Sequence, residues 1–132
     1  MNVLSIIPAR GGSKGIKLKN LVKLNQKSLL YYTVNASLNS KIINKTIVST
    51  DDLAIAKNAI KLGAEVISRP KKLAMDSTPL EPVIEHVLTH LKKNQNYTPD
   101  IIVILQNTSP LRNAKHIDES LLLMKKENFD SI

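Results

Sequence analysis

Short apolar runs alternate with helix-like segments along the chain, and this alternation constrains the fold more than any other feature. The runs at residues 3–7, 46–49, 65–68 and 101–105 predict strands, and the segments at residues 29–38, 53–62, 79–91 and about 114–126 predict helices. The last run is apolar throughout, as is typical of strands buried on both faces of a parallel sheet. Elements in this order predict an α/β fold, with a mostly parallel sheet and helices on both of its faces.

Capping residues mark the ends of two of these helices. Asp51 is expected to cap the second helix, and Gly63 is expected to end it. Thr78 is expected to cap the third helix, with Pro79 at its first position and Glu81 completing a capping box. The third helix then presents one apolar face, which consists of Leu80, Ile84, Val87, Leu88 and Leu91.

The net charge of +8 is confined to the first fifty residues. Eight of the 19 lysines and arginines precede Asp51, the first acidic residue, whereas the remaining 11 basic residues balance the 11 acidic ones. A basic segment of this kind favours an anionic ligand in that part of the chain. Only 3% of the residues are aromatic, so the stacking surfaces of single-strand nucleic-acid binders are largely missing and a small anion is favoured. A solvated lysine-rich surface is the alternative that charge alone leaves open.

Length and composition limit the class of protein. With 132 residues, 42% of them hydrophobic, the chain is expected to form one domain over residues 1–132 with a core of its own. The sequence has no cysteine, no signal-peptide pattern and no apolar run of about 18 residues, so we expect a soluble, cytoplasmic protein without disulfides. Residues 129–132 resemble the entry into another strand, and we expect a domain truncated at its C-terminus.

A glycine-rich loop directly follows the first predicted strand. It reads Arg10-Gly11-Gly12-Ser13-Lys14-Gly15, and open α/β sheets bind ligands beyond the carboxyl ends of their strands, where this loop would lie. Glycines let backbone N–H groups approach a phosphate, arginine grips a phosphate through paired hydrogen bonds, and lysine adds a mobile charge. The spacing matches neither a Walker loop nor the dinucleotide fingerprint. A phosphate-binding loop is predicted, with a purely structural turn as the alternative.

Four sequence blocks together resemble the acylneuraminate cytidylyltransferase family. They are Ile7-Pro8-Ala9-Arg10-Gly11-Gly12-Ser13-Lys14-Gly15-Ile16 followed by Lys19-Asn20, then Ser49-Thr50-Asp51-Asp52, then Arg69-Pro70 with Leu73-Ala74-Met75-Asp76, and finally Leu105-Gln106-Asn107-Thr108-Ser109-Pro110-Leu111-Arg112. The blocks follow the order of the family and cover essentially the whole chain. The resemblance implies a three-layer, Rossmann-like nucleotidyltransferase domain. It also implies transfer of CMP from CTP to an acidic nine-carbon sugar of the sialic-acid type, with release of pyrophosphate.

The same resemblance implies roles for individual residues. The triphosphate of CTP would be held by Arg10, Ser13, Lys14 and Lys19, of which Arg10 and Lys14 would also act in catalysis, and Asn20 would contact the nucleotide or its phosphates. Arg69 would help to read the cytosine ring, together with backbone groups of Ala9, Asp76, Ser77 and Thr78. Gln106 would face the acceptor sugar. The implied cofactor is Mg²⁺, whose ligands would lie beyond residue 132, and the implied assembly is a homodimer that binds neither nucleic acid nor membrane.

Some positions depart from the pattern of the family. Leu80 stands where some members place a hydroxyl residue near the base, which puts side-chain contacts with the base in doubt there. Asn107 replaces the proline that usually follows the glutamine, and Lys17-Leu18-Lys19 varies a segment that often carries proline.

Other polar residues are expected to have ordinary roles. Asp51 and Asp52 are not expected to replace the missing metal ligands. His86 and His90 are four residues apart on a helix, but no carboxylate completes a zinc motif beside them, so we expect an exposed helix face. His116 is expected on the surface.

Two other functions compete with this interpretation. Activation of the eight-carbon sugar Kdo is related chemistry, but it usually has a different loop after the arginine. A non-catalytic, basic nucleotide- or RNA-binding module is the second alternative, and many phosphate contacts would give it a steep dependence on salt. The sequence does not distinguish sialic, legionaminic and pseudaminic acid as the acceptor.

Overall fold

The structure is a computed structural model that describes residues 1–11, 23–24, 27–75, 78–106 and 118. In chain order, these residues form β1 (Val3–Pro8), β2 (Lys23–Leu24), β3 (Lys27–Ser28), α1 (Leu29–Leu38), β4 (Lys45–Thr50), α2 (Leu53–Leu62), β5 (Glu65–Ser68), the short 3-10 helix η2 (Lys71–Leu73), α3 (Leu80–Gln95) and β6 (Ile101–Ile104). Each strand and helix predicted within these ranges is present. The predicted helix at about 114–126 lies outside the described residues, except for Asp118, which is helical.

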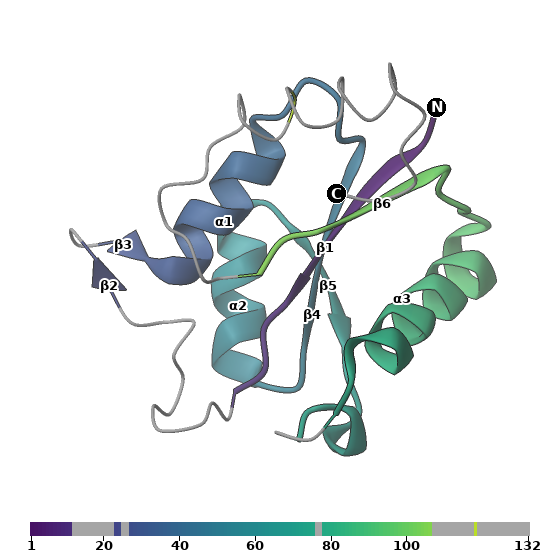
Figure 1. The fold of residues 1–132 in the computed structure, drawn as a ribbon. Coiled ribbons are helices and arrows are strands. Elements are labelled where there is room, and N and C mark those ends of the chain that lie inside the picture. Colours follow the sequence, from purple (N-terminus) through teal and green to yellow (C-terminus); the bar gives the residue numbers. More distant parts are fainter. Residues whose placement is uncertain (12–22, 25–26, 76–77, 107–117, 119–132) are drawn as a thin grey trace.

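The described strands form a parallel sheet in the order β5-β4-β1-β6. In register, Ile6 of β1 lies between Ile47 of β4 and Ile104 of β6. The antiparallel pair β2–β3, which the sequence did not predict, stands apart from this sheet (Figure 1). The predicted parallel sheet is therefore confirmed.

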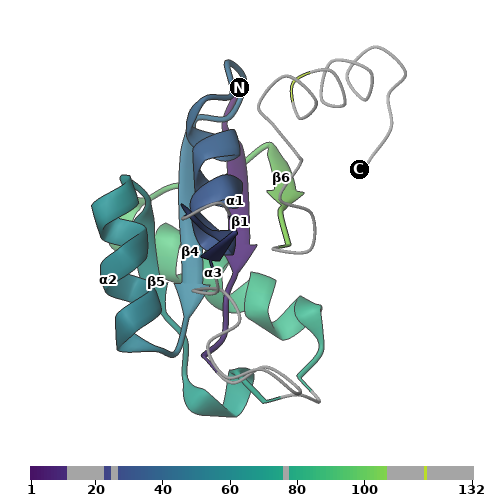
Figure 2. The ribbon, with the colours of Figure 1, turned by 90° about the vertical axis from the view of Figure 1, so that its left-hand side faces the viewer.

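The order of the strands decides where the helices lie. The chain steps from β1 to β4 and on to β5 in one direction, then returns past β1 to form β6. Crossovers between parallel strands are right-handed, so a reversal of direction moves the connecting helix to the opposite face of the sheet. Accordingly, α1 and α2 cover one face and α3 covers the other (Figures 1 and 2). This arrangement confirms the predicted three layers.

Side chains of β1 alternate between the two cores, as expected for a strand covered on both faces. Val3 and Ile7 pack with α1 and α2, whereas Leu4 and Ile6 pack with α3, and all four are fully buried. The apolar face predicted on α3 is confirmed for four of its five residues, since Val87 and Leu91 are buried and Ile84 and Leu88 pack against the same core.

The prediction for β6 holds only in part. Val103 is buried, but Ile102, on the face toward α3, is 37% exposed. Among the described residues, β6 pairs with β1 alone, so it forms an edge of the described sheet. An edge position leaves the strand covered on fewer sides than a strand in the middle of a sheet.

Both predicted N-caps are wrong in detail. The cap of α2 is Asp52, whose side chain accepts a hydrogen bond from the Ile55 N–H at 3.0 Å, and Asp51 is used elsewhere. The N-cap of α3 is Pro79, whose side chain has no atom that can accept a hydrogen bond, and the hydroxyl of the predicted cap Thr78 is bonded to the Met75 N–H instead. Gly63 ends α2 as predicted, with a left-handed φ of 102° that favours glycine.

A chain of three buried hydroxyl groups joins α1 to the sheet. The hydroxyl of Ser37 lies 2.6 Å from that of Ser5 on β1 and 2.6 Å from that of Thr46 on β4. Because each hydroxyl both donates and accepts, this chain satisfies polar groups that would otherwise be costly to bury.

Asp118 contacts the loop between α1 and β4. Its carboxylate accepts hydrogen bonds from the Ser40 hydroxyl and from the Lys41 N–H. Asp118 therefore lies beside the loop that enters β4, at the amino end of that strand.

We find no candidate membrane-spanning helix among the described residues, judged by helix length and apolar character.

Candidate functional site

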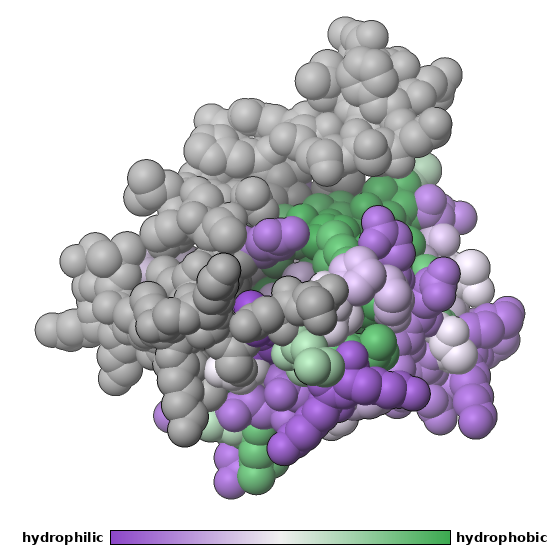
Figure 3. Space-filling model, turned by 60° about the horizontal axis from the view of Figure 1, so that its bottom comes forward, coloured by the Kyte–Doolittle hydropathy of each residue, from purple (hydrophilic) through white to green (hydrophobic). Residues whose placement is uncertain are grey.

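The strand order has its switch point between β1 and β6, and open α/β sheets bind ligands at such points, beyond the carboxyl ends of the strands. The Leu105 N–H donates to the Ile6 carbonyl at 3.0 Å, so the exit of β6 runs beside the end of β1. The next residues on the two strands are Gln106, which is exposed, and the start of the glycine-rich loop. The carboxyl ends of the strands lie at the bottom of Figure 1, and Figure 3 turns this side toward the viewer and shows many hydrophilic side chains on it.

Two hydrogen bonds donated by backbone N–H groups fix the exit of β1. The buried Ala9 donates its N–H to the Ser49 carbonyl at 2.9 Å. The Gly11 N–H donates to Oδ1 of Asp51 at 2.8 Å. Arg10 lies between these two anchors and is half-buried, so the backbone at the start of the predicted phosphate loop is held on both sides of the arginine.

Packing against Asp52 explains why a glycine stands at position 11. A Cβ atom at this position would lie 2.8 Å from Cβ and 2.9 Å from Oδ2 of Asp52. The Asp52 side chain has little freedom to withdraw, because it caps α2. The sequence explains Gly11 only by the approach of a phosphate. The structure adds close packing against Asp52, which lies 41 positions later in the chain.

Arg69 is predicted to read a base, and the structure places it at the carboxyl ends of β4 and β5. The residue is only 7% exposed. Its Nε–H donates to the Ser49 hydroxyl at 3.1 Å, its Nη2–H to the Ser49 carbonyl at 2.9 Å, and its Nη1–H to the Leu73 carbonyl at 3.1 Å. These bonds use three of its five N–H groups and tie η2 to the sheet.

Charges around Arg69 are mixed. Burial lowers the pKa of Arg69 from its ordinary value, the Asp51 carboxylate raises it, and the charge of Arg10 lowers it. Asp51 therefore lies close enough to act on the guanidinium of Arg69 while it also holds Gly11. No sequence pattern predicts this arrangement, because Gly11, Asp51 and Arg69 are about twenty to forty residues apart.

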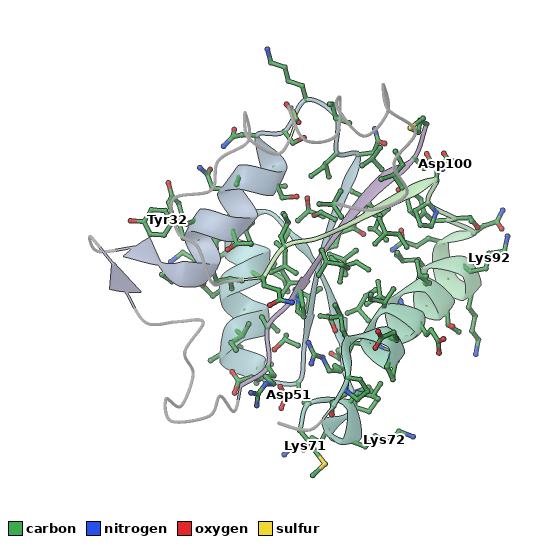
Figure 4. The ribbon with its side chains drawn as sticks, in the orientation of Figure 1. Tyr32, Asp51, Lys71, Lys72, Lys92 and Asp100 are labelled. Atoms are coloured by element: carbon green, nitrogen blue, oxygen red, sulfur yellow. The ribbon has the colours of Figure 1, made fainter. Side chains whose placement is uncertain are left out.

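The turn before α3 completes the described part of the site. Thr78 accepts a hydrogen bond from the Met75 N–H at 3.1 Å through its hydroxyl, and its own N–H donates to the Met75 carbonyl at 3.0 Å. Lys71 and Lys72 are exposed at the same end of the sheet as Asp51 (Figure 4). These two lysines were not predicted as site residues.

His86 differs from its prediction. It is half-buried rather than exposed, and its Nδ1 atom is buried without a hydrogen-bond partner. Burial lowers the pKa of His86, and the charges of His90 and Arg69 lower it further. His90 is exposed as predicted. Within the described ranges, no three His, Asp or Glu side chains are placed to share a metal ion.

Several predicted site residues lie outside the described residues. They are Ser13, Lys14, Lys19, Asn20, Asp76 and Ser77. The same is true of Asn107 and His116. Of the predicted set, the structure places Ala9, Arg10, Arg69, Thr78 and Gln106, all at the carboxyl-end side of the sheet.

Comparison with known sequences gives consistent matches. A sequence model of the cytidylyltransferase family matches residues 4–132. The chain is 38% identical over 121 residues to an N-acylneuraminate cytidylyltransferase of Escherichia coli O18:K1:H7, which covers 92% of this chain and 28% of that protein. It is 35% identical to N-acylneuraminate cytidylyltransferase A of Danio rerio, over 99% of this chain and 29% of that protein.

The chain covers a larger share of a third relative. The chain is 38% identical over 114 residues to a pseudaminic acid cytidylyltransferase of Campylobacter jejuni, which covers 86% of this chain and 49% of that protein. The chain thus spans between 28% and 49% of the length of these curated relatives.

Solved structures share the fold. A CMP:2-keto-3-deoxy-manno-octonic acid synthetase complexed with CTP superposes with a TM-score of 0.76 at 19% identity, over 98% of this chain and 49% of that chain. A cytidylyltransferase from Leptospira borgpetersenii superposes with a TM-score of 0.70 at 23% identity, over 98% of this chain and 51% of that chain.

Proposed function

This chain belongs to the cytidylyltransferase family, and we propose that the whole protein transfers CMP from CTP to a nonulosonic acid, a sugar of the sialic-acid type, with release of pyrophosphate. Relatives named for N-acylneuraminate and for pseudaminic acid, at 35–38% identity, support this class of acceptor. The likeness to the eight-carbon-sugar synthetase is a likeness of fold, at 19% identity, and does not favour that acceptor.

The observation that carries the proposal is the meeting of two segments at the switch point. Arg10 and Gly11 leave β1 where Gln106 leaves the neighbouring β6. The first segment is cationic and rich in glycine, as a triphosphate requires, and the second carries an exposed amide that can bond sugar hydroxyl groups. A donor phosphate and an acceptor sugar would therefore meet between two adjacent strands.

The proposed reaction is an in-line displacement at phosphorus. The anomeric hydroxyl of the sugar forms a bond to the α-phosphorus of CTP and loses its proton, while the bond to the β-phosphate oxygen breaks and pyrophosphate leaves. Such transfers are catalysed mainly by positioning and by neutralising charge. Arg10 and Lys14 are the groups proposed to neutralise the triphosphate, and the loop N–H groups would orient it.

Arg69 is proposed to act at the base end, mainly by shaping the backbone. Its bonds to Ser49 and Leu73 hold η2 against the sheet and so fix the course of the chain toward residues 74–78. Backbone groups of Ala9, Asp76, Ser77 and Thr78 would then bind the cytosine. The N–H groups of Arg69 that do not bond to Ser49 or Leu73 would bind it as well. Hydrogen-bonding sites of this kind discriminate strongly against the wrong base.

Magnesium does not fit the described residues. Asp51 is bonded to Gly11, Asp52 caps α2, and no further acidic or histidine side chain of the described ranges joins them in a cluster. A Mg²⁺ ion that accompanies the triphosphate would need ligands from elsewhere in the protein. A homodimer is also proposed, on the family resemblance alone, and the cytoplasmic location expected from the composition stays a proposal.

Pyrophosphate release by the whole protein tests the reaction. With CTP, Mg²⁺ and N-acetylneuraminic, legionaminic or pseudaminic acid, at least one acid should support turnover. Arg10→Ala removes a charge-assisted, bidentate contact and should lower kcat/KM for CTP at least about tenfold. Lys41→Ala is the matched control, because Lys41 precedes β4 at the opposite end of the sheet, and it should leave kcat/KM unchanged. Equal loss in both variants would contradict the site.

A salt series separates this function from nucleic-acid binding. A mononucleotide site contacts few phosphates, so the logarithm of its affinity should fall only gently with the logarithm of the salt concentration. An RNA-binding module would show a steep slope and would prefer long polyanions to CTP. The second pattern would support the binding module in place of the enzyme.

A further inference from the structure

Asp51 is the first acidic residue of the chain, and the reaction proposed above gives it no role. It follows β4 directly, at the carboxyl end of the sheet (Figure 4). Its Oδ1 atom accepts the Gly11 N–H at 2.8 Å in a half-buried position. The bond spans 40 residues and reaches the first glycine of the predicted phosphate loop.

The backbone that carries Asp51 is held firmly. Thr50 is buried in β4, and its hydroxyl accepts a hydrogen bond from the Asp52 N–H at 3.1 Å. Asp52 in turn caps α2 and lies against Gly11. The carboxylate of Asp51 is thus presented from a rigid junction between a buried strand and a helix.

The Asp51 carboxylate is poorly suited to bind the triphosphate directly. A carboxylate beside a triphosphate repels it, because like charges raise the energy of the complex. The repulsion is tolerable where the carboxylate is engaged by the protein, and here it accepts the Gly11 N–H and lies near the cationic Arg69.

We propose that Asp51 is a positioning residue, which fixes Gly11 and through it aims the neighbouring Arg10 at the triphosphate. The inference rests on the proposed function for the identity of the ligand, but the contact with Gly11 does not depend on it. Asp51 acts through a backbone N–H and does not touch the substrate. It links the phosphate end of the site to the end where Arg69 lies.

Two variants separate the hydrogen bond from the charge. Asp51→Ala removes both, whereas Asp51→Asn keeps an oxygen that can accept the Gly11 N–H and removes the charge. In titrations of the whole protein with CTP, Asp51→Ala should raise Kd roughly tenfold, which corresponds to about 1.4 kcal/mol. Asp51→Asn should bind CTP at least as tightly as the natural protein, because the repulsion is gone.

A carboxylate at the opposite end of the sheet supplies the control. Asp100 accepts the Asn2 N–H at 2.6 Å, which is the same kind of contact away from the site (Figure 4). Asp100→Ala should leave the Kd for CTP unchanged. An Asp51→Ala protein that binds CTP like the natural one would overturn the proposal. So would an Asp51→Asn protein as weak as Asp51→Ala, since the charge would then be the active feature.

Hydrogen exchange without nucleotide tests the positioning itself. The Gly11 amide should be protected in the natural protein and in Asp51→Asn, and it should exchange faster in Asp51→Ala. If the natural protein bound no CTP, the proposed function would fail, and the exchange at Gly11 would still decide whether Asp51 positions the loop. Unchanged exchange in Asp51→Ala would overturn the inference.

Discussion

Replacing Gly11 with alanine tests the close packing at the start of the loop. The new Cβ would lie 2.8 Å from Cβ of Asp52, where ordinary contacts are 3.4–4 Å. Relief requires either a shift of the loop or withdrawal of Asp52 from its cap on α2. Overpacking of this kind costs about 1–3 kcal/mol, and loss of a cap costs about 0.5–2 kcal/mol. We expect Gly11→Ala to lower the free energy of unfolding by about 2 kcal/mol.

A second substitution makes this prediction specific. Asp52→Gly removes the atoms that clash, and glycine at an N-cap costs only about a few tenths of a kcal/mol. In denaturant unfolding of the whole protein, the double variant should recover most of the loss, with a coupling of roughly 1–2 kcal/mol. Gly63→Ala is the control, because its cost comes from a φ of 102° and Asp52→Gly should not relieve it. Additive effects of Gly11→Ala and Asp52→Gly would refute the packing argument.

Three further changes probe other features. Arg69→Met should lower the free energy of unfolding by about 1–3 kcal/mol, measured in denaturant, because the Ser49 hydroxyl loses the donor that Arg69 supplies, while the Ser49 carbonyl keeps the Ala9 N–H; a loss below about 1 kcal/mol would contradict this. Ser37→Ala should cost about 1–3 kcal/mol in the same assay, since two buried hydroxyls lose their shared partner. The pKa of His86 is lowered in the folded protein from its ordinary value of 6.5, so the folded state binds a proton less readily than the unfolded state. The contribution of His86 to stability is therefore complete above pH 6.5, and it is lost as the pH falls through the lowered pKa. His86→Leu should therefore flatten the acid side of a thermal-unfolding profile, and an unchanged acid side would contradict this.

Local patterns predicted the parts of the fold that depend on neighbours in sequence. Four strands and three helices were placed correctly because apolar periodicity and Gly63 act over a few residues. The pair β2–β3 was missed, since two-residue strands carry no periodicity. The carboxylates Asp51 and Asp52 are both competent caps, and only the contact between Gly11 and Asp51 decides which one is free to cap α2.

The candidate site was predicted by motif rather than by geometry. The family resemblance selected Arg10, Arg69 and Gln106, which the structure places at one end of the sheet. It did not predict that Arg69 donates three hydrogen bonds to the protein itself. These bonds depend on how strands and turns pack in three dimensions, which the sequence pattern does not show. It also missed the buried Nδ1 of His86 for the same reason.

Product identification with competing nucleotides tests the proposed function most directly. The whole protein would receive equal concentrations of CTP and UTP with Mg²⁺ and one nonulosonic acid, and the products would be identified by mass spectrometry. A site that hydrogen-bonds cytosine leaves buried groups unpaired when uracil is bound, so the UMP-linked sugar should be at least about a hundredfold rarer than the CMP-linked sugar. The predicted result is a CMP-linked sugar with one pyrophosphate released for each product. Comparable amounts of UMP-linked sugar, or nucleotide hydrolysis without any linked sugar, would contradict the account.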